Sequence, residues 1–183
     1  ECLPVMDLKN TGKFENPYSE GFVSVYHSTY NNDGYATIDL CNYPNKGIDY
    51  KKLIDKIVYT KEIDTGDTDN NEDKIIRLVL PYEIISYRVP MNESIKTKLE
   101  WLAGTLDAYG SDLSDESGIE LDIIDNSILS HNIKLMNQTL GLNTDIKIIN
   151  QLNISCYTIK FTSSDVYKLR QLGMITYRLK NNG

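Results

Sequence analysis

The feature that most constrains the fold is a near-repetition of one order of secondary-structure elements along the 183 residues. In the first half, hydrophobic periodicity and turn residues predict five elements in turn. These are a helix over 17–26, a hairpin around Gly34, a helix over 48–59, a hairpin over 61–81 and a closing helix over 82–88.

The second half follows the same order. Its predicted elements are a helix over 93–109 capped by Asn92, a strand over 118–124, a helix over 127–140, strands over 145–150 and 155–162, and a closing helix capped by Ser163 or Ser164. Gly21 and Gly104 occupy equivalent places, 83 residues apart. The chain therefore predicts an α+β fold of two fused, pseudosymmetric halves, 1–92 and 93–183, each helix-hairpin-helix-hairpin-helix.

The composition predicts a folded intracellular protein. Hydrophobic residues make up 40% of the chain, but runs such as IIRLVL at 75–80 are far shorter than the roughly 20 residues of a membrane span. Three separated cysteines without a CxxC pair are typical of a reducing compartment. Because the chain begins with Glu1-Cys2, we expect it to be a piece of a longer parent chain.

The charge disfavours nucleic acid as a partner. Nineteen basic and 26 acidic residues give a net charge of −7, with 10 against 15 in residues 1–92 and 9 against 11 in residues 93–183. A protein that lies along phosphates normally presents a basic face. The acids gather in 62–73 and 112–125, six in each, which we interpret as solvated hairpin loops.

Metal and cofactor motifs are not evident. Asp67 begins a calcium-like spacing, but Glu72 stands where that loop needs Gly, and Leu78 where it needs Glu. The two histidines, His27 and His131, have no zinc-site spacing, and no glycine-rich phosphate loop occurs. We therefore predict neither a bound metal nor a cofactor.

Two segments resemble motifs of a known family. WLAGTLDAYG at 101–110 resembles the dodecapeptide of the LAGLIDADG homing endonucleases, and PYSEGFVSVYHSTY at 17–30 is similar to the first motif in endonuclease domains of viral inteins. VPMNESIKTKLEWLAG and LGMITYRL resemble the same group, so the likeness runs from Phe14 to Leu179. It implies two motif helices packed at the centre, with duplex DNA as the partner and an association with a virus.

The resemblance also implies roles for particular residues. Gly21, Gly104 and Ala108 suit the close contact between the motif helices, because small residues let two backbones approach. In the family, one carboxylate at the end of each motif helix binds magnesium, which assists phosphodiester hydrolysis.

This sequence departs from the pattern at both acid positions, which Tyr26 and Tyr109 occupy. A phenol has a pKa of about 10 and is a poor magnesium ligand. Asp107 is retained but lies roughly 200° around the helix from Tyr109. The nearest substitute acids are Glu20 and Asp112, and His27 is a candidate base.

Three functions stay open. The chain is predicted to be a degenerate, catalytically inactive LAGLIDADG endonuclease domain derived from an intein or intron, with Tyr26 and Tyr109 close together at the ends of the paired helices. The first alternative is an active magnesium-dependent DNA endonuclease with relocated acids. The second is a structural or protein-interaction module in a larger assembly, whose binding would respond little to salt, whereas binding to DNA would weaken steeply.

Overall fold

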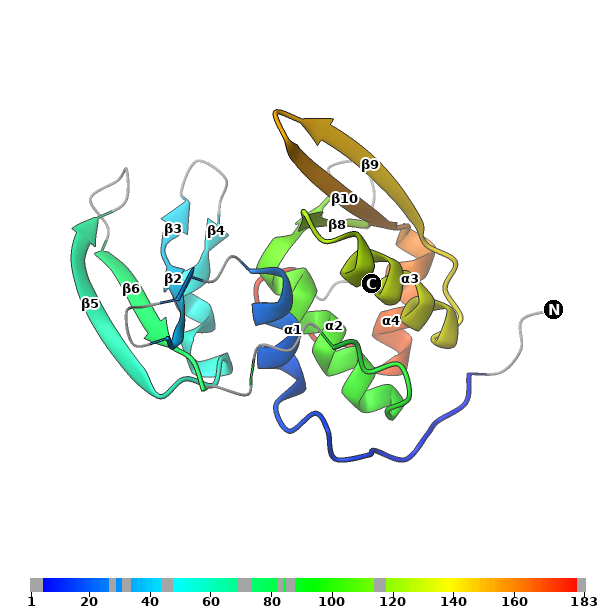
Figure 1. Cartoon of the computed structure of the whole chain (residues 1–183). Coiled ribbons are helices and arrows are strands. Elements are labelled where there is room, and N and C mark those ends of the chain that lie inside the picture. The colour runs from blue at the N-terminus through cyan, green and yellow to red at the C-terminus, as the bar shows by residue number, and fades with distance from the viewer. Residues whose placement is uncertain are drawn as a thin grey trace.

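The computed structural model describes residues 5–26, 29–30, 34–43, 48–68, 74–81, 84, 88–113 and 118–180. The first half contains α1 (Pro17–Val25), β1 (Thr29–Tyr30), β2 (Ala36–Leu40), β3 (Asn42–Tyr43), β4 (Ile48–Asp49), the 3-10 helix η2 (Tyr50–Lys56), β5 (Lys61–Thr68) and β6 (Lys74–Val79). The second contains α2 (Ile95–Tyr109), β7 (Gly110–Asp112), β8 (Ile119–Ile124), α3 (Ser127–Thr139), β9 (Asp145–Gln151), β10 (Ile154–Phe161) and α4 (Ser163–Leu172). Figure 1 shows the whole chain.

Each half builds one antiparallel sheet of four strands. The orders are β1-β2-β6-β5 and β7-β8-β10-β9, and β3 pairs with β4 in a small separate sheet. Helices α1 and α2 lie side by side between the two large sheets (Figure 1). The predicted α+β fold of two similar halves, packed through their motif helices, is confirmed.

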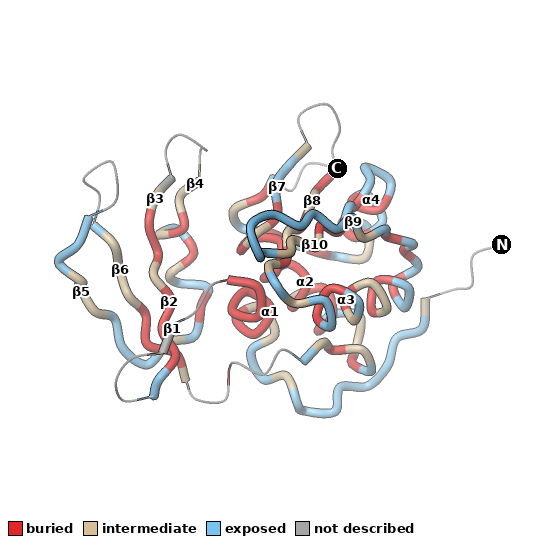
Figure 2. The backbone as a smooth tube through the Cα atoms, turned by 45° about the horizontal axis from the view of Figure 1, so that its top comes forward, coloured by how far each residue is buried: buried red, intermediate tan, exposed pale blue. Residues whose placement is uncertain are grey.

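The core is built from the inner faces of both sheets and from the two central helices. Alternation along β8 buries Ile119, Leu121 and Ile123, and helical spacing on α2 buries Leu99, Leu102 and Leu106. Both central helices are buried along most of their length (Figure 2). A helix that is covered on all sides must meet its neighbours with small residues or with satisfied polar groups.

Several helix starts differ from their predictions. Ser94, rather than Asn92, caps α2 by accepting a hydrogen bond from Thr97 N. Thr162, rather than Ser163 or Ser164, caps α4 in a capping box with Asp165. In both cases the cap lies at an extended residue close to the predicted one, and local propensity does not separate such neighbours.

Other elements also differ. The helix predicted over 48–59 is the shorter 3-10 helix η2, and β7, which directly follows α2, was not predicted. Most of the closing helix predicted over 82–88 lies outside the described residues, as do His27 and Cys2. In the described parts of the chain, no helix is long and apolar enough to cross a membrane.

The N-terminal segment 5–16 runs along the second half (Figure 1). Asp7 Oδ1 accepts a hydrogen bond from Ile95 N, and Asn10 Oδ1 accepts one from Ser94 N, so both side chains satisfy amides at the start of α2. The first residues of the chain therefore help to hold the second motif helix.

Candidate functional site at the ends of the paired helices

Helices α1 and α2 touch through their backbones. A Cβ atom added to Gly21 would lie 1.9 Å from the Trp101 carbonyl oxygen, and one added to Gly104 would lie 2.0 Å from the Tyr18 carbonyl oxygen. No side chain fits at either position. Ala108, one turn beyond Gly104, is fully buried. The crossing fixes how the C-terminal ends of the two helices meet.

Tyr26 and Tyr109 lie together at these ends. Their ring centroids are 5.7 Å apart with an interplanar angle of 36°, so their predicted proximity is confirmed. Tyr26 also stacks on Phe22, with ring centroids 5.0 Å apart, and forms a T-shaped pair with Tyr50 at 5.2 Å. The positions that carry carboxylates in the family motif thus form part of an aromatic cluster.

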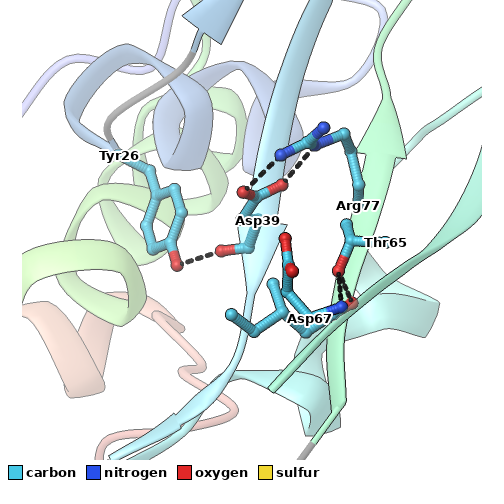
Figure 3. Close-up of polar contacts among 6 residues, drawn as sticks. Tyr26, Asp39, Thr65, Asp67 and Arg77 are labelled. Atoms are coloured by element: carbon cyan, nitrogen blue, oxygen red, sulfur yellow. Dashed lines mark hydrogen bonds and ion pairs between the residues drawn. The ribbon is translucent and has the colours of Figure 1, made fainter. Parts of the chain in front are cut away.

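The hydroxyl of Tyr26 is fixed by the first sheet. It donates a 2.7 Å hydrogen bond to the carbonyl oxygen of Asp39 on β2. The Asp39 carboxylate in turn accepts from Arg77 Nε at 2.8 Å and Nη2 at 3.0 Å, a bidentate ion pair with the neighbouring strand β6 (Figure 3). Tyr26 is therefore tied to the sheet by its oxygen as well as by its ring.

The retained motif acid, Asp107, has a structural role. It is fully buried, and its Oδ2 accepts from the Tyr18 hydroxyl at 2.6 Å and from Tyr177 N at 2.8 Å. Its Oδ1 accepts from the amides of Arg178 and Leu179 at 3.1 and 3.2 Å. One carboxylate thus fastens both α1 and the segment after α4 to helix α2.

Arg178 closes the C-terminal end of α2. Its Nε donates to the Asp107 carbonyl oxygen at 2.6 Å, and its Nη2 donates to the carbonyl oxygens of Leu106 and Gly110. The final carbonyls of a helix carry partial negative charge, so a guanidinium is well placed there. The guanidinium also lies over the Tyr50 ring, 5.6 Å from its centroid. Sequence reasoning missed Arg178 and Tyr50, and no local spacing signals either residue.

The buried phenols near the site stay protonated. Burial raises the pKa of Tyr50, although Arg178 nearby opposes the shift. Burial and the neighbouring Asp107 raise the pKa of Tyr18. The Tyr50 hydroxyl donates a 2.5 Å hydrogen bond to the carbonyl oxygen of Ala108, at the end of α2. These hydroxyls act as hydrogen-bond donors to the protein and supply no anionic oxygen.

The two proposed substitute acids lie at different ends of the helix pair. Glu20 is buried in the first turns of α1, roughly 9 Å along the axis from Tyr26 at 1.5 Å per residue. There its Oε2 accepts from Asn16 N at 3.2 Å and its Oε1 lies 3.9 Å from Arg88 Nη2. Asp112 is exposed on β7, beyond the other end. Glu20 and Asp112 therefore do not form one site, and the described residues hold no cluster of three metal-ligating side chains.

The acidic segment 112–125, which we interpreted as a solvated hairpin loop, contains the strand β8 instead, and few of its carboxylates lie on the sheet face. Strand alternation puts only Glu120 and Asp122 on the face of β8 opposite the core. Asp122 accepts a hydrogen bond from Thr158, and Lys160 lies directly opposite Glu120. Asp125 is used in a turn, where it accepts from Ser155 N, and residues 114–117 lie outside the described parts. This face carries mixed charge.

Comparison with solved structures identifies the architecture. The N-terminal LAGLIDADG domain of DUF199/WhiA matches with a TM-score of 0.54 at 14% identity, over 94% of this chain and 87% of that one. The chain has the LAGLIDADG fold. The homing endonuclease I-DmoI, as a single-residue variant in complex with its target DNA in the presence of magnesium, matches with a TM-score of 0.54 at 11% identity, over 90% of this chain and 98% of that one.

The LAGLIDADG fold is shared here without close sequence similarity. Full-length DUF199/WhiA from Thermatoga maritima matches at 16% identity with a TM-score of 0.54, and the match spans 90% of this chain and 57% of that one. No protein-family model and no curated protein sequence matches the chain. The likeness therefore establishes the fold, and the chemistry must be argued from this chain's own residues.

Proposed function

We propose that this chain is a LAGLIDADG domain that has lost metal-dependent phosphodiester cleavage. The observation that carries the proposal is the contact between Tyr26 and Tyr109, with ring centroids 5.7 Å apart. In the family, the same two positions present carboxylates at the meeting point of the helices. Here they present aromatic rings, and the Tyr26 hydroxyl donates to a backbone carbonyl.

The chemistry of the surrounding groups supports this proposal. Magnesium is a hard cation that takes anionic and carbonyl oxygens as ligands. The carbonyl oxygens of Leu106, Asp107 and Gly110 are already bound by the Arg178 guanidinium, whose positive charge repels a second cation. The carboxylate of Asp107, the motif acid that remains, already accepts four hydrogen bonds from within the protein.

An active endonuclease with relocated acids is less well supported. Such an enzyme needs two carboxylates within reach of one metal ion, whereas Glu20 and Asp112 lie at different ends of the helix pair. The proposal includes an origin in an intein, an intron or a virus. The support for this part is the resemblance of the motif at 17–30 to the first motif in endonuclease domains of viral inteins.

Binding of duplex DNA is proposed to be weak and strongly dependent on salt. The outer face of the second sheet carries acids on β8 beside lysines on β9 and β10, so few phosphate contacts could be made. A protein-interaction role is the second candidate. It is favoured by the exposed apolar side chains of the β9–β10 hairpin, among them Ile148 and Leu152.

Site-specific broadening by Mn²⁺ tests the loss of the metal site without knowledge of a DNA target. In a ¹H–¹⁵N spectrum, we expect substoichiometric Mn²⁺ to broaden the amides of Tyr26, Tyr109 and Gly110 no more than those of other buried residues. The double substitution Tyr26→Asp and Tyr109→Asp restores the acids, and the same amides should then broaden selectively. Exposed acids bind Mn²⁺ elsewhere, which serves as an internal reference.

The matched control is Tyr26→Phe with Tyr109→Phe, which keeps the rings and adds no charge. It should behave like the natural chain. Selective broadening at Tyr26 and Tyr109 in the natural chain, together with magnesium-dependent strand breaks in mixed-sequence duplex DNA at low salt, would overturn the proposal. Strand breaks without that broadening would also overturn the proposal, because they would require a metal site elsewhere on the chain.

A further inference from the structure

The outer edge of β9 is a long, regular strand edge that no described strand covers. β9 is the last strand of the sheet β7-β8-β10-β9. It pairs with β10 through seven consecutive residue pairs, from Asp145–Lys160 to Gln151–Ile154, without a register shift. The hairpin extends beyond the helices (Figure 1). An edge of this kind offers a row of backbone donors and acceptors to another strand.

The equivalent edge of the first sheet is protected. β5 pairs with β6 but changes register between Asp64 and Thr68, where Gly66 has a φ of 74°. Asp64 also forms an exposed ion pair with Lys74 across the hairpin, at 3.6 Å. Irregular register and charged side chains are the usual means by which an edge strand avoids pairing with another molecule.

The β9–β10 hairpin exposes large apolar side chains instead. The exposed fractions are 57% for Ile148, 39% for Ile149, 96% for Leu152 and 50% for Ile154. No large hydrophobic residue is exposed to this degree in the described parts of β5 and β6. In the turn, Leu152 and Asn153 have φ values of 46° and 68°, which is costly for a leucine. The β9–β10 hairpin thus exposes apolar side chains at a defined position on the surface.

We propose that β9 pairs edge to edge with β9 of a second copy of this chain, joining the two sheets across a twofold axis at Ile148. Antiparallel pairing centred on Ile148 uses the whole strand from Asp145 to Gln151. Each Asp145 then lies opposite Gln151 of the second copy, and each Lys147 lies opposite Ile149. No like charges face each other, and the two Ile148 side chains meet at the axis.

The charge of the hairpin also suits a second copy. The chain as a whole carries −7, which opposes self-association through most of its surface. β9 itself is neutral, with Asp145 and Lys147, and β10 adds only Lys160. Two acidic chains can therefore meet at this strand without bringing their acids together.

The inference does not depend on the proposed loss of cleavage. Tyr109 is followed directly by β7, which forms the opposite edge of the same sheet from β9. Loss or recovery of a metal site at the helix ends would leave the β9 edge unchanged.

Sedimentation velocity over a range of concentrations tests the association. We expect the natural chain to form dimers at micromolar concentration, with little change between low and high salt. The Ile148→Lys substitution places two positive charges at the axis, and we expect it to raise the dimer dissociation constant by about tenfold or more. Thr68→Lys adds the same charge to the exposed edge of β5 and should leave the dissociation constant unchanged.

Cross-linking provides a second measurement that does not rely on a disrupted variant. Residues directly opposite in an antiparallel pair have Cβ atoms about 4.5–5.5 Å apart, and a disulfide requires about 3.5–4.5 Å, so a small local shift brings two opposed cysteines within reach. With copper phenanthroline and oxygen as oxidant, I148C should give a covalent dimer, and T68C should not. A natural chain that stays monomeric at the highest concentrations, or a dimer weakened by Thr68→Lys rather than Ile148→Lys, would refute the proposal.

Discussion

The two motif helices meet symmetrically, yet their ends are secured by different means. Gly21 and Gly104 make matching backbone contacts, and Tyr26 and Tyr109 follow them at the same spacing. The equivalent of Asp107 in the first half is Ser24, whose hydroxyl donates to the Gly21 carbonyl oxygen of its own helix at 2.7 Å. The helix α1 thus has no buried acid near its C-terminal end.

The two motif helices are therefore symmetric in their backbone contacts and asymmetric in their polar contacts. In the second half, Arg178 donates hydrogen bonds to the fully buried Asp107, and these bonds join α2 to the segment after α4. In the first half, Tyr26 reaches a strand whose own ion pair, Asp39 with Arg77, is about two-fifths exposed. Close packing of the two backbones requires a glycine at the equivalent position of each helix. The polar groups of each half, by contrast, can be satisfied by whatever residues lie nearby.

The largest expected effect tests the symmetric backbone contact between α1 and α2. Gly21→Ala and Gly104→Ala each place a methyl group within 2.0 Å of a backbone oxygen, so the helices must separate. We expect each substitution to lower the free energy of unfolding by about 3 kcal/mol or more. Urea denaturation followed by circular dichroism measures the change.

Gly34→Ala is the control for this pair. Gly34 has a φ of 81° and no atom near an added Cβ, so only backbone strain of about 1–2 kcal/mol is expected. Equal losses of unfolding free energy for Gly21→Ala and Gly104→Ala would support a symmetric crossing of the two helices. A loss at either site no greater than the control would show that the helices do not touch as described.

The second prediction tests the different polar contacts at the ends of the two helices. Asp107→Asn keeps the shape but turns an amide group toward donors, and we expect a loss of roughly 2–4 kcal/mol because buried hydrogen bonds to a charged group are broken. Asp39→Asn removes a half-exposed ion pair and should cost less than about 1 kcal/mol. Both are measured by urea denaturation. Similar costs for the two variants would contradict the difference between the halves.

Much of the fold could be predicted from the sequence because its signals are local. Apolar spacing located α2 and α3, alternation located β8, and the paired glycines with the motif tyrosines indicated which helix ends would meet. These signals act within one or two turns of chain, where propensity and periodicity are informative.

The remaining contacts join distant segments. Arg178 binds the end of α2 from 71 residues away, and the segment 5–16 reaches the start of that helix across more than 80 residues. No pattern near Arg178 distinguishes it from a solvated surface arginine. Likewise, the composition of 112–125 shows its charge but not that alternation and turns divide the acids between different surfaces.

The smallest expected effect concerns another difference between the helices. Glu20 is buried in α1, whereas its equivalent in α2 is the buried Ala103. Burial raises the pKa of Glu20 above its ordinary 4.5, and Asn16 and Arg88 only partly oppose the shift. Between 4.5 and the raised value, the folded chain binds more protons than the unfolded chain, so this group makes stability fall as pH rises.

Glu20→Gln removes that dependence while keeping the size of the side chain. We expect the variant to equal or exceed the natural chain in stability at neutral pH, by no more than about 0.5 kcal/mol, and the difference to vanish below pH 4.5. Glu62→Gln, at an exposed position on β5, should change stability at neither pH. Urea denaturation on both sides of pH 4.5 provides the comparison. A variant that is less stable than the natural chain only at neutral pH would mean that attraction to Arg88 outweighs burial, and that α1 too is secured by a buried acid.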